Sequence, residues 1–247
     1  SKSLQEGQIL LLENLRFHDG ETAGDEEFAR LLARNGDVYV NDAFGTAHRA
    51  HASTAVIAHY FEEKAPGLVL EREIENVEKV LKGGKSPVTA IVGGAKVSSK
   101  ISVLENLLPK IDNLIIGGGM AFTFVKAQGG KVGNSLVEDD FLETAYRILQ
   151  EAKEQGVKVY LPKDSVNADK FANDTDINTS PSDAIPDGYM GLDAGPETLS
   201  ELRQVLIGSK TILWNGPMGV FEFENFAKGT IQVGELAKLM AVKGGEV

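Results

Sequence analysis

Short apolar runs alternate with amphipathic stretches along most of this chain. The runs are mostly unbroken rather than alternating, which is typical of parallel strands that are covered on both faces. Each run ends in a glycine or polar turn, and an amphipathic stretch usually follows. The candidate strands are residues 7–17, 37–44, 87–94, 113–118, 158–166 and 210–216.

The amphipathic stretches carry helix signals of their own. Residues 25–34 place apolar side chains on one face before an Asn-Gly stop. Ser135 and Glu138 have the spacing of a capping box, and the apolar period that follows ends at Gly156. Pro196 opens another helix. Strands that alternate with helices at this spacing predict an α/β fold with mainly parallel sheets.

The chain has a predicted boundary at residues 71–86. This stretch is a charged helix with a narrow apolar stripe, and the breaker Gly-Gly-Lys-Ser-Pro follows it. We therefore expect two α/β units, one over residues 1–70 and one over residues 87–247, joined by a helix and linker.

Composition narrows the class of protein. The 247 residues are 42% hydrophobic and 25% charged, which is a globular balance. The net charge of −11 argues against a general nucleic-acid or membrane-surface binder. The chain has no cysteine, and no apolar run approaches the roughly 20 residues that span a bilayer. The opening residues do not form a signal peptide, and we expect a piece of a longer protein.

Glycine is enriched, at 27 residues, and it gathers at the ends of candidate strands. The clusters are GGAK at 93–96, GGGM at 117–120 and NGPMG at 215–219. In open α/β sheets, ligands bind outside the carboxyl ends of the strands. The clusters thus indicate a ligand site, although glycine also serves simply to make tight turns.

The segment GGAKVSSK at 93–100 is the most informative of these. We expect a helix to begin directly after Gly94, with Lys96 and Lys100 on one face of its first turn. Positive charge is unfavourable there unless an anion binds the free N–H groups and the two lysines together. The pattern therefore favours a phosphate site, and the alternative is two solvated lysines.

Basic residues also follow the candidate strands of the first unit. Arg16 ends one strand, and His48, Arg49 and His51 follow another. In an acidic segment, this placement indicates an anion pocket, and the alternative is surface arginines paired with neighbouring acids. His48 and His51 lack the spacing of a helical metal site.

Several familiar motifs are excluded. The GGKS string at 83–86 is not a phosphate-binding Walker loop, because Lys79 stands where that loop needs glycine. There is no G-x-G-x-x-G dinucleotide fingerprint. The string at 174–178 resembles a calcium loop, but Thr179 and Ile185 occupy positions that require glycine and glutamate.

Taken together, the motifs resemble the phosphoglycerate kinase family over nearly the whole chain. The segments that carry the resemblance are LLLENLRF, VNDAFGTAHRAHAST, AIVGGAKVSSKI, LIIGGGMAFTF, GYMGLDAGPET and WNGPMGVFE. The resemblance implies two Rossmann-like three-layer α/β/α units. It also implies reversible phosphoryl transfer between 1,3-bisphosphoglycerate and MgADP, which gives 3-phosphoglycerate and MgATP.

The resemblance also implies roles for individual residues. Arg16, His48 and Arg49 would bind phosphoglycerate, and Lys96 and Arg49 would be catalytic. Glu222 would accept hydrogen bonds from the ribose. No metal ligand is implied among the residues present. The implied nucleotide-binding residues are Gly94, Lys96, Lys100, Gly117, Gly118, Gly119, Gly191, Leu192, Asn215, Pro217, Val220 and Glu222.

By the same resemblance, residues 1–70 are the remainder of a phosphoglycerate-binding domain, and residues 87–247 are a nucleotide-binding domain without its last segment. The family implies a monomer in the cytoplasm, with the plastid stroma as the alternative, that uses Mg²⁺ with ADP or ATP. Two other readings stay open. One is a different nucleotide-binding α/β enzyme, such as an oxidoreductase, and the other is a non-catalytic nucleotide-binding fragment.

Overall fold

The computed structural model describes residues 3–247, without the side chains of residues 80–82. The chain divides into two compact units, Ser1–Glu78 and Lys79–Val247. The division lies within helix α4 (Leu68–Gly83), inside the range 71–86 expected to link the units. None of the described helices is long and apolar enough to cross a membrane.

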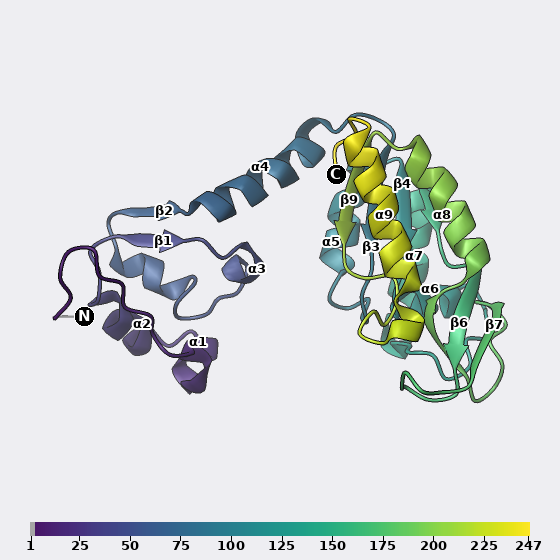
Figure 1. The fold of residues 1–247 in the computed structure, drawn as a ribbon, viewed down its shortest axis with the longest axis horizontal. Helices are drawn as coiled ribbons and strands as arrows, with labels where there is room; N and C mark the ends of the chain where they lie inside the picture. Colours follow the sequence, from purple (N-terminus) through teal and green to yellow (C-terminus); the bar gives the residue numbers. More distant parts are fainter. Residues whose placement is uncertain (1–2) are drawn as a thin grey trace. The chain divides into compact units, whose positions relative to one another are not determined.

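The first unit contains a small parallel sheet. Strands β1 (Tyr39–Asn41) and β2 (Lys64–Pro66) lie side by side, with Tyr39 opposite Lys64 (Figure 1). The core is formed by Ala29, Ala52 and Ile57. The other elements are η1 (Leu15–Phe17), α1 (Asp19–Ala23), α2 (Glu26–Ala33), α3 (Phe44–Ala47) and η2 (Val56–Tyr60).

Helix α2 confirms the helix expected over residues 25–34, because the Asp25 carboxylate caps it by accepting from the backbone N–H of Phe28 at 2.7 Å. The strand expected over residues 7–17 is wrong. Only the 3-10 turn η1 forms there, and the side chains of Ile9 and Leu11 are 93% and 91% exposed. A strand needs a neighbour for its N–H and C=O groups, and no described strand pairs with this run.

The second unit is built on a parallel sheet with the strand order β5-β4-β3-β9. All five residues of β3 are buried, as expected for a strand covered on both faces. The predicted strands over 87–94, 113–118 and 210–216 are confirmed. The strands are β3 (Val88–Val92), β4 (Asn113–Ile116), β5 (Lys158–Tyr160) and β9 (Thr211–Asn215).

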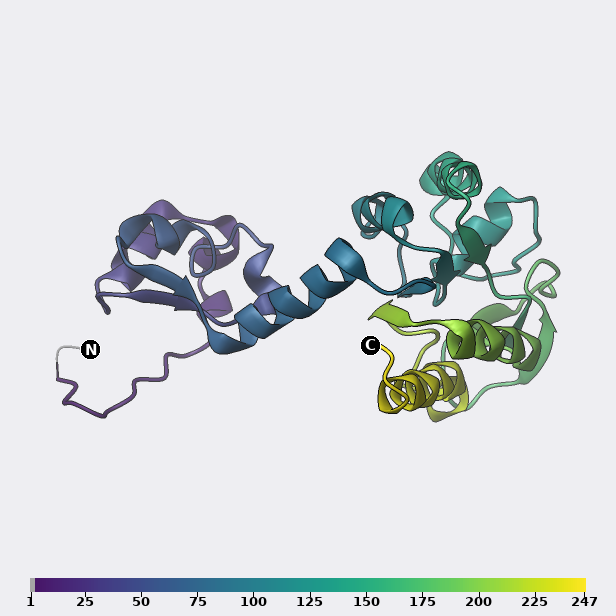
Figure 2. The ribbon, with the colours of Figure 1, turned by 90° about the horizontal axis from the view of Figure 1, so that it is seen from above.

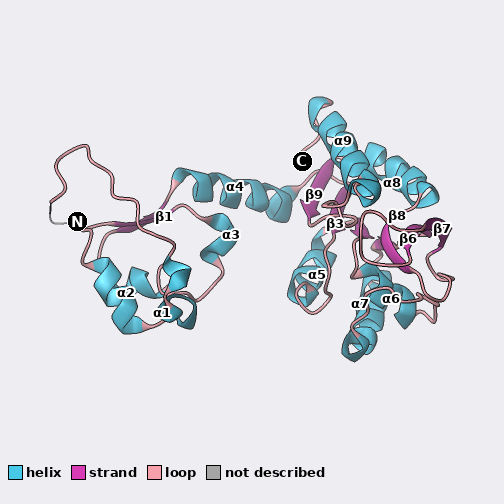
Figure 3. Cartoon of the chain, turned by 60° about the horizontal axis from the view of Figure 1, so that its bottom comes forward, coloured by secondary structure: helices cyan, strands magenta, loops and turns pink. Residues whose placement is uncertain are grey.

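Helices cover both faces of this sheet (Figures 2 and 3). Val88, Ala90 and Val92 pack in one cluster with side chains of α5, α6 and α7. Ile91 points to the other face and packs with α8 and α9. The α/β class with mainly parallel sheets is therefore confirmed. The helices are α5 (Ile101–Leu107), η3 (Leu108–Lys110), α6 (Ala121–Ala127), η4 (Asp139–Phe141), α7 (Leu142–Glu154), α8 (Pro196–Gly208), η5 (Glu224–Phe226) and α9 (Lys228–Val242).

A smaller antiparallel sheet has the strand order β7-β6-β8. Its strands are β6 (Asp164–Ala168), β7 (Ile177–Pro181) and β8 (Met190–Ala194). The single strand expected over residues 158–166 is therefore wrong, because β5 ends at Tyr160 and β6 begins in a different sheet. Pro162 lies in the gap, where its missing N–H interrupts strand pairing.

The helix expected from Ser135 begins later, at Leu142. The capping box is wrong because both of its side chains bind elsewhere. The Ser135 hydroxyl accepts from the backbone N–H of Gly191 at 2.9 Å, and the Glu138 carboxylate accepts from Ser98. Residues 135–138 thus form a loop that other parts of the second unit hold in place.

Candidate functional site

The three glycine turns meet at one edge of the parallel sheet. Val92 of β3 lies opposite Ile116 of β4 and Asn215 of β9, so the three strands end at the same level. Backbone hydrogen bonds then join the turns. The N–H of Gly93 donates to Asn215 at 2.8 Å, that of Gly118 to Met218 at 2.9 Å, and that of Met120 to Gly94 at 3.0 Å.

Glycine is required at this junction for a physical reason. Gly118 has a φ of +68°, and a Cβ atom there would lie 2.6 Å from the carbonyl oxygen of Gly94. Gly216 has a φ of +97°, and its Cβ would lie 2.3 Å from the carbonyl oxygen of Gly93. Both the left-handed backbone and the close approach exclude a side chain. The turns therefore present backbone at the end of the sheet.

A cavity of about 490 Å³ opens beside these turns, within the size range of small-molecule sites. Its walls combine glycine backbone with apolar side chains, and Glu222 contributes a carboxylate. Such walls suit a flat apolar ring with a polar tail. The lining residues are Gly94, Ala95, Gly118, Gly119, Asn134, Leu136, Phe171, Met190, Gly191, Leu192, Pro217, Gly219, Val220 and Glu222.

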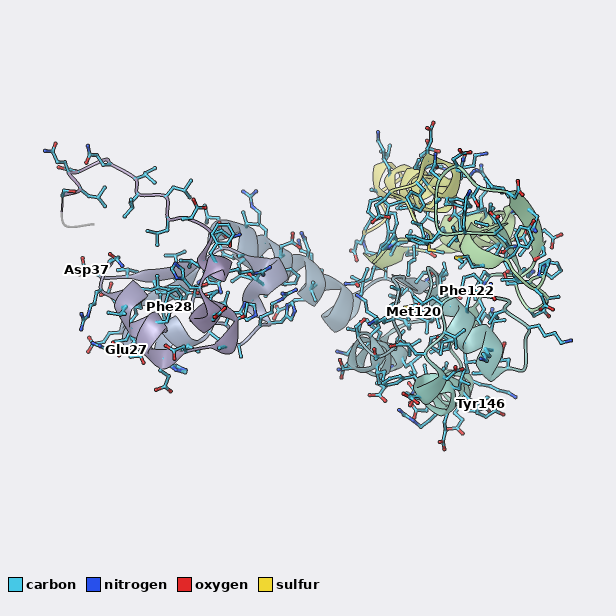
Figure 4. All side chains as sticks on the ribbon, turned by 90° about the horizontal axis from the view of Figure 1, so that it is seen from below. Glu27, Phe28, Asp37, Met120, Phe122 and Tyr146 are labelled. Atoms are coloured by element: carbon cyan, nitrogen blue, oxygen red, sulfur yellow. The ribbon has the colours of Figure 1, made fainter. Side chains whose placement is uncertain are left out.

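Gly191 shows how tightly this wall is packed. A Cβ atom on Gly191 would lie 2.1 Å from the ring of Phe122. Phe122 lies in the first turn of α6, two residues after Met120, and both side chains are labelled in Figure 4. Glycine at position 191 thus allows β8 to lie close to α6, because any larger residue would displace the aromatic ring.

Many of the residues assigned to nucleotide binding from the sequence line this cavity. They are Gly94, Gly118, Gly119, Gly191, Leu192, Pro217, Val220 and Glu222. Gly117, Asn215, Lys96 and Lys100 do not line it.

Lys100 nevertheless lies at its rim, because a Cβ on Gly94 would be 3.9 Å from the Cε atom of Lys100. The Lys100 ammonium donates to the side-chain oxygen of Asn215. These two assigned residues are therefore in direct contact with each other, next to a glycine of the cavity wall.

The helix expected directly after Gly94 is wrong. Helix α5 begins at Ile101, and Lys100 is the residue before it. Lys96 is exposed in an irregular loop, so neither lysine lies in a first helical turn. The loop takes another path because Ser98 gives its backbone N–H to the Glu138 carboxylate, at 3.0 Å, rather than to a helical pattern.

Sequence reasoning missed several residues of this site. Asn134, Leu136, Phe171 and Met190 line the cavity, and Glu138 holds the adjoining loop. Leu136 and Glu138 lie in the segment where a helix was expected from Ser135, so they were not identified as residues of a site. Phe171 had a usable signal, because it is a single aromatic residue in a long polar loop.

The candidate residues of the first unit are exposed. Arg16 lies in η1, and His48 and Arg49 follow α3. Neither arginine forms an ion pair with any residue that the structure describes. No hydrogen bond among the described residues joins the three side chains.

The loop after Arg49 is anchored by a buried carboxylate. Glu21 is 3% exposed and accepts from the hydroxyl of Ser53 at 2.6 Å and from its N–H at 3.1 Å. The hydroxyl of Thr54 donates to the carbonyl of Arg49 at 2.7 Å.

The described residues of the whole chain contain no group of three or more His, Asp or Glu placed to hold a metal ion.

A parallel sheet with a glycine-walled cavity beyond its strand ends is the arrangement in which open α/β proteins bind their ligands. Comparison with known protein families shows to which of these α/β families the chain belongs. The family model described as phosphoglycerate kinase matches residues 1–246, and the chain belongs to that family.

Known relatives agree with this. The chain is 54% identical over 241 residues to a phosphoglycerate kinase of Rippkaea orientalis, covering 98% of this chain and 60% of the relative. It is 51% identical to a cytosolic phosphoglycerate kinase of Triticum aestivum, with the same coverage. The chain therefore spans about 60% of the length of these relatives.

Solved structures show the same likeness. The phosphoglycerate kinase of Coxiella burnetii matches with a TM-score of 0.76 and 42% identity, covering 94% of this chain and 59% of that one. That of Pyrococcus horikoshii matches with a TM-score of 0.80 and 29% identity, covering 96% and 61%.

Proposed function

We propose that this chain is part of a phosphoglycerate kinase, which transfers phosphate reversibly between 1,3-bisphosphoglycerate and MgADP to give 3-phosphoglycerate and MgATP. The observation that carries the proposal is the cavity beyond the ends of β3, β4 and β9, with Glu222 in its wall. The missing dinucleotide fingerprint disfavours an oxidoreductase.

In this proposal, residues 87–247 bind the nucleotide, and residues 71–86 link them to the other substrate's domain. The apolar wall of Leu136, Met190 and Leu192 holds the adenine, and Glu222 accepts hydrogen bonds from the ribose. Lys100 reaches the phosphates from the rim. Its ammonium exchanges the amide oxygen of Asn215 for a charged partner, which forms a stronger hydrogen bond.

Phosphoryl transfer requires positioning and neutralisation of charge more than covalent chemistry. Lys96 is exposed beside the turn that ends β3 and would offset charge on the transferring group. The attacking and leaving oxygens are already ionised, so no general base is needed. In this proposal, Mg²⁺ enters with the nucleotide as MgADP.

The acid substrate is assigned to residues 1–70, which lie within the first unit. Arg16, His48 and Arg49 would bind phosphoglycerate, and Arg49 would also assist transfer. The guanidinium groups of both arginines are free of ion pairs with the described residues, which supports an anion as their partner. We propose a cytosolic monomer by analogy with the family, with the plastid stroma as the alternative location.

The nucleotide site is tested by calorimetry on the 247-residue chain. ADP should bind more tightly than NAD. Lys100→Ala should weaken ADP about tenfold, the value of a charge-assisted hydrogen bond, and leave adenosine binding unchanged. Lys110→Ala is the matched control, since Lys110 is exposed and precedes the opposite end of β4. Equal affinity for ADP and NAD would contradict the assignment.

The acid site is tested by NMR. Added 3-phosphoglycerate should shift signals of residues 1–78, and the effect should weaken with salt because it depends on charge. Arg16→Ala and Arg49→Ala should each lose about 1.5–3 kcal/mol of binding free energy. Shifts confined to residues 79–247 would show that the substrate has been assigned to the wrong unit.

A further inference from the structure

Both carboxylate oxygens of Glu138 accept hydrogen bonds from Ser98, which belongs to the lysine loop (residues 93–100). Its Oε1 accepts from the hydroxyl of Ser98 at 2.6 Å, and its Oε2 accepts from the backbone N–H of Ser98 at 3.0 Å. Ser98 is two residues from Lys96. A bidentate contact to a charged group fixes both distance and orientation, so it restrains the backbone that carries Lys96.

Other hydrogen bonds from outside the loop hold its two ends, at Gly93, Gly94 and Lys100. Residues 93–100 form neither helix nor strand, and Lys96 and Ser98 are exposed. Within the loop, the Ser99 hydroxyl donates to the carbonyl of Lys96 at 2.9 Å, and the N–H of Lys100 donates to Val97 at 2.8 Å. Val97 is buried and anchors the middle. The contact with Glu138 comes from outside and ties the exposed side of the loop.

Glu138 is itself held by the core. Its N–H donates at 3.1 Å to the hydroxyl of Thr123, which is 1% exposed in α6. Two residues earlier, Leu136 lines the nucleotide cavity and packs against Gly119, where a Cβ would lie 3.2 Å from its Cδ2. One short segment therefore forms a wall of the cavity and also restrains the lysine loop.

Electrostatics keep this carboxylate ionised. Burial acts to raise the pKa of Glu138, but the hydrogen bonds from Ser98 and Val97 and the charge of Lys96 outweigh it, so the pKa is lowered overall. A negative charge close to bound phosphate would by itself repel it. If Glu138 promotes phosphate binding, it must do so through the position of the loop.

We propose that Glu138 is a positioning residue, which holds the lysine loop through Ser98 so that the ammonium of Lys96 faces the phosphates of a nucleotide in the cavity. This inference rests on the proposed function. It gives Glu138 a role in binding phosphate and not adenosine, because its carboxylate contacts the lysine loop.

The test compares ADP and adenosine binding to the 247-residue chain by calorimetry. Glu138→Gln keeps the size of the side chain but places an NH2 group against one of the two donors of Ser98. We expect ADP affinity to fall about tenfold, as for loss of one charge-assisted hydrogen bond, with adenosine affinity unchanged. Backbone NMR signals of residues 95–99 should also shift before nucleotide is added.

Asp139→Asn is the matched control, since it removes the same charge one residue away. Asp139 pairs with Lys126 at 2.8 Å, and its side chain is 69% exposed, so ADP affinity should not change. Ser98→Ala should reproduce the loss, Ser98→Thr should retain affinity, and combining Ser98→Ala with Glu138→Gln should add little.

Three outcomes would overturn the inference. Unchanged or tighter ADP binding by Glu138→Gln would show that the carboxylate acts only as a charge or not at all. An equal loss for ADP and adenosine would show a general structural role. A wild-type chain that binds neither ligand would contradict the nucleotide site as well, whereas the first two outcomes contradict the role of Glu138 alone.

Discussion

Asp193 is a buried carboxylate beside the proposed nucleotide cavity. It lies in β8, is 4% exposed, and accepts from the N–H of Gly229 at 2.8 Å at the start of α9. Its Oδ1 has no hydrogen-bond partner among the described residues. Cβ atoms on Gly219 or Gly229 would each lie 2.2 Å from this oxygen, so the two glycines make room for it. A buried charge with an unpartnered oxygen is destabilising.

The first prediction concerns the pH dependence of Asp193. Burial raises its pKa from 3.8 to about 6, and a shift of this size changes the free energy of unfolding by about 3 kcal/mol. The folded state binds the proton more tightly than the unfolded state. The protonated carboxyl therefore contributes its full stabilisation below pH 3.8, and this contribution is lost as the pH rises through 6. Asp193→Asn should therefore be more stable than wild type at pH 7 and lose that advantage near pH 4, as measured by urea unfolding.

Asp174→Asn provides the control, because Asp174 is exposed and its substitution should change the free energy of unfolding little. An Asp193→Asn protein with the same stability as wild type at pH 7 would mean that the charge is compensated in solution.

At the scale of the element, helix α8 depends on a residue outside it. Its N-cap residue is Gly195, which has no side chain for capping. Asp164 of β6 takes that role, accepting from the N–H of Thr198 at 2.8 Å, from the N–H of Glu197 at 3.1 Å and from the hydroxyl of Thr198 at 2.7 Å. The helix is thereby fixed to the small antiparallel sheet.

The second prediction is that Asp164→Ala lowers the free energy of unfolding by about 3 kcal/mol, because it leaves the buried N–H of Thr198 and the N–H of Glu197 without their acceptor. Chemical denaturation followed at several wavelengths would measure this. Asp169→Ala removes an exposed carboxylate that contacts only its own loop and should cost about 0.5 kcal/mol or less. Equal losses for the two variants would rule out the capping role.

Prediction of elements from the sequence succeeded where the signal was local. Strands β3, β4 and β9 are apolar runs closed by glycine, and α2 and α8 carry their start signals within a few residues. The run at 7–17 is equally apolar, but no strand among the described residues pairs with it. Whether a run has a partner strand cannot be predicted from the run alone. Likewise, Ser135 and Glu138 have capping spacing, yet Gly191 and Ser98 take their hydrogen bonds.

At the scale of the whole molecule, the two units differ in how much apolar surface they bury. The main clusters on both faces of the parallel sheet belong to residues 79–247. The first unit has a small cluster around Ala29, Ala52 and Ile57. Stability grows with the buried apolar area, so the second unit should be the more stable one.

The third prediction is that residues 79–247 alone unfold cooperatively, with nearly the same midpoint as in the whole chain. Trp214, the only tryptophan, lies in β9 and reports on this unit by fluorescence. ADP at about 100 times its dissociation constant should stabilise the fragment by about 2.7 kcal/mol. A gradual transition, or a midpoint far below that of the whole chain, would show that residues 1–78 are needed for the second unit to fold.

The α/β class, the glycine turns at the strand ends and the family could all be predicted from the sequence, because they depend on local periodicity and on short motifs. The residues that surround the cavity, the position of Lys96 and the hydrogen bonds of Glu138 instead follow from packing between distant segments. Glu138 and Ser98 are forty positions apart, and they meet where Met120, at the start of α6, donates to the carbonyl of Gly94 in the turn after β3. Hydrogen bonds between distant segments leave no period in the sequence, and these bonds shape the site.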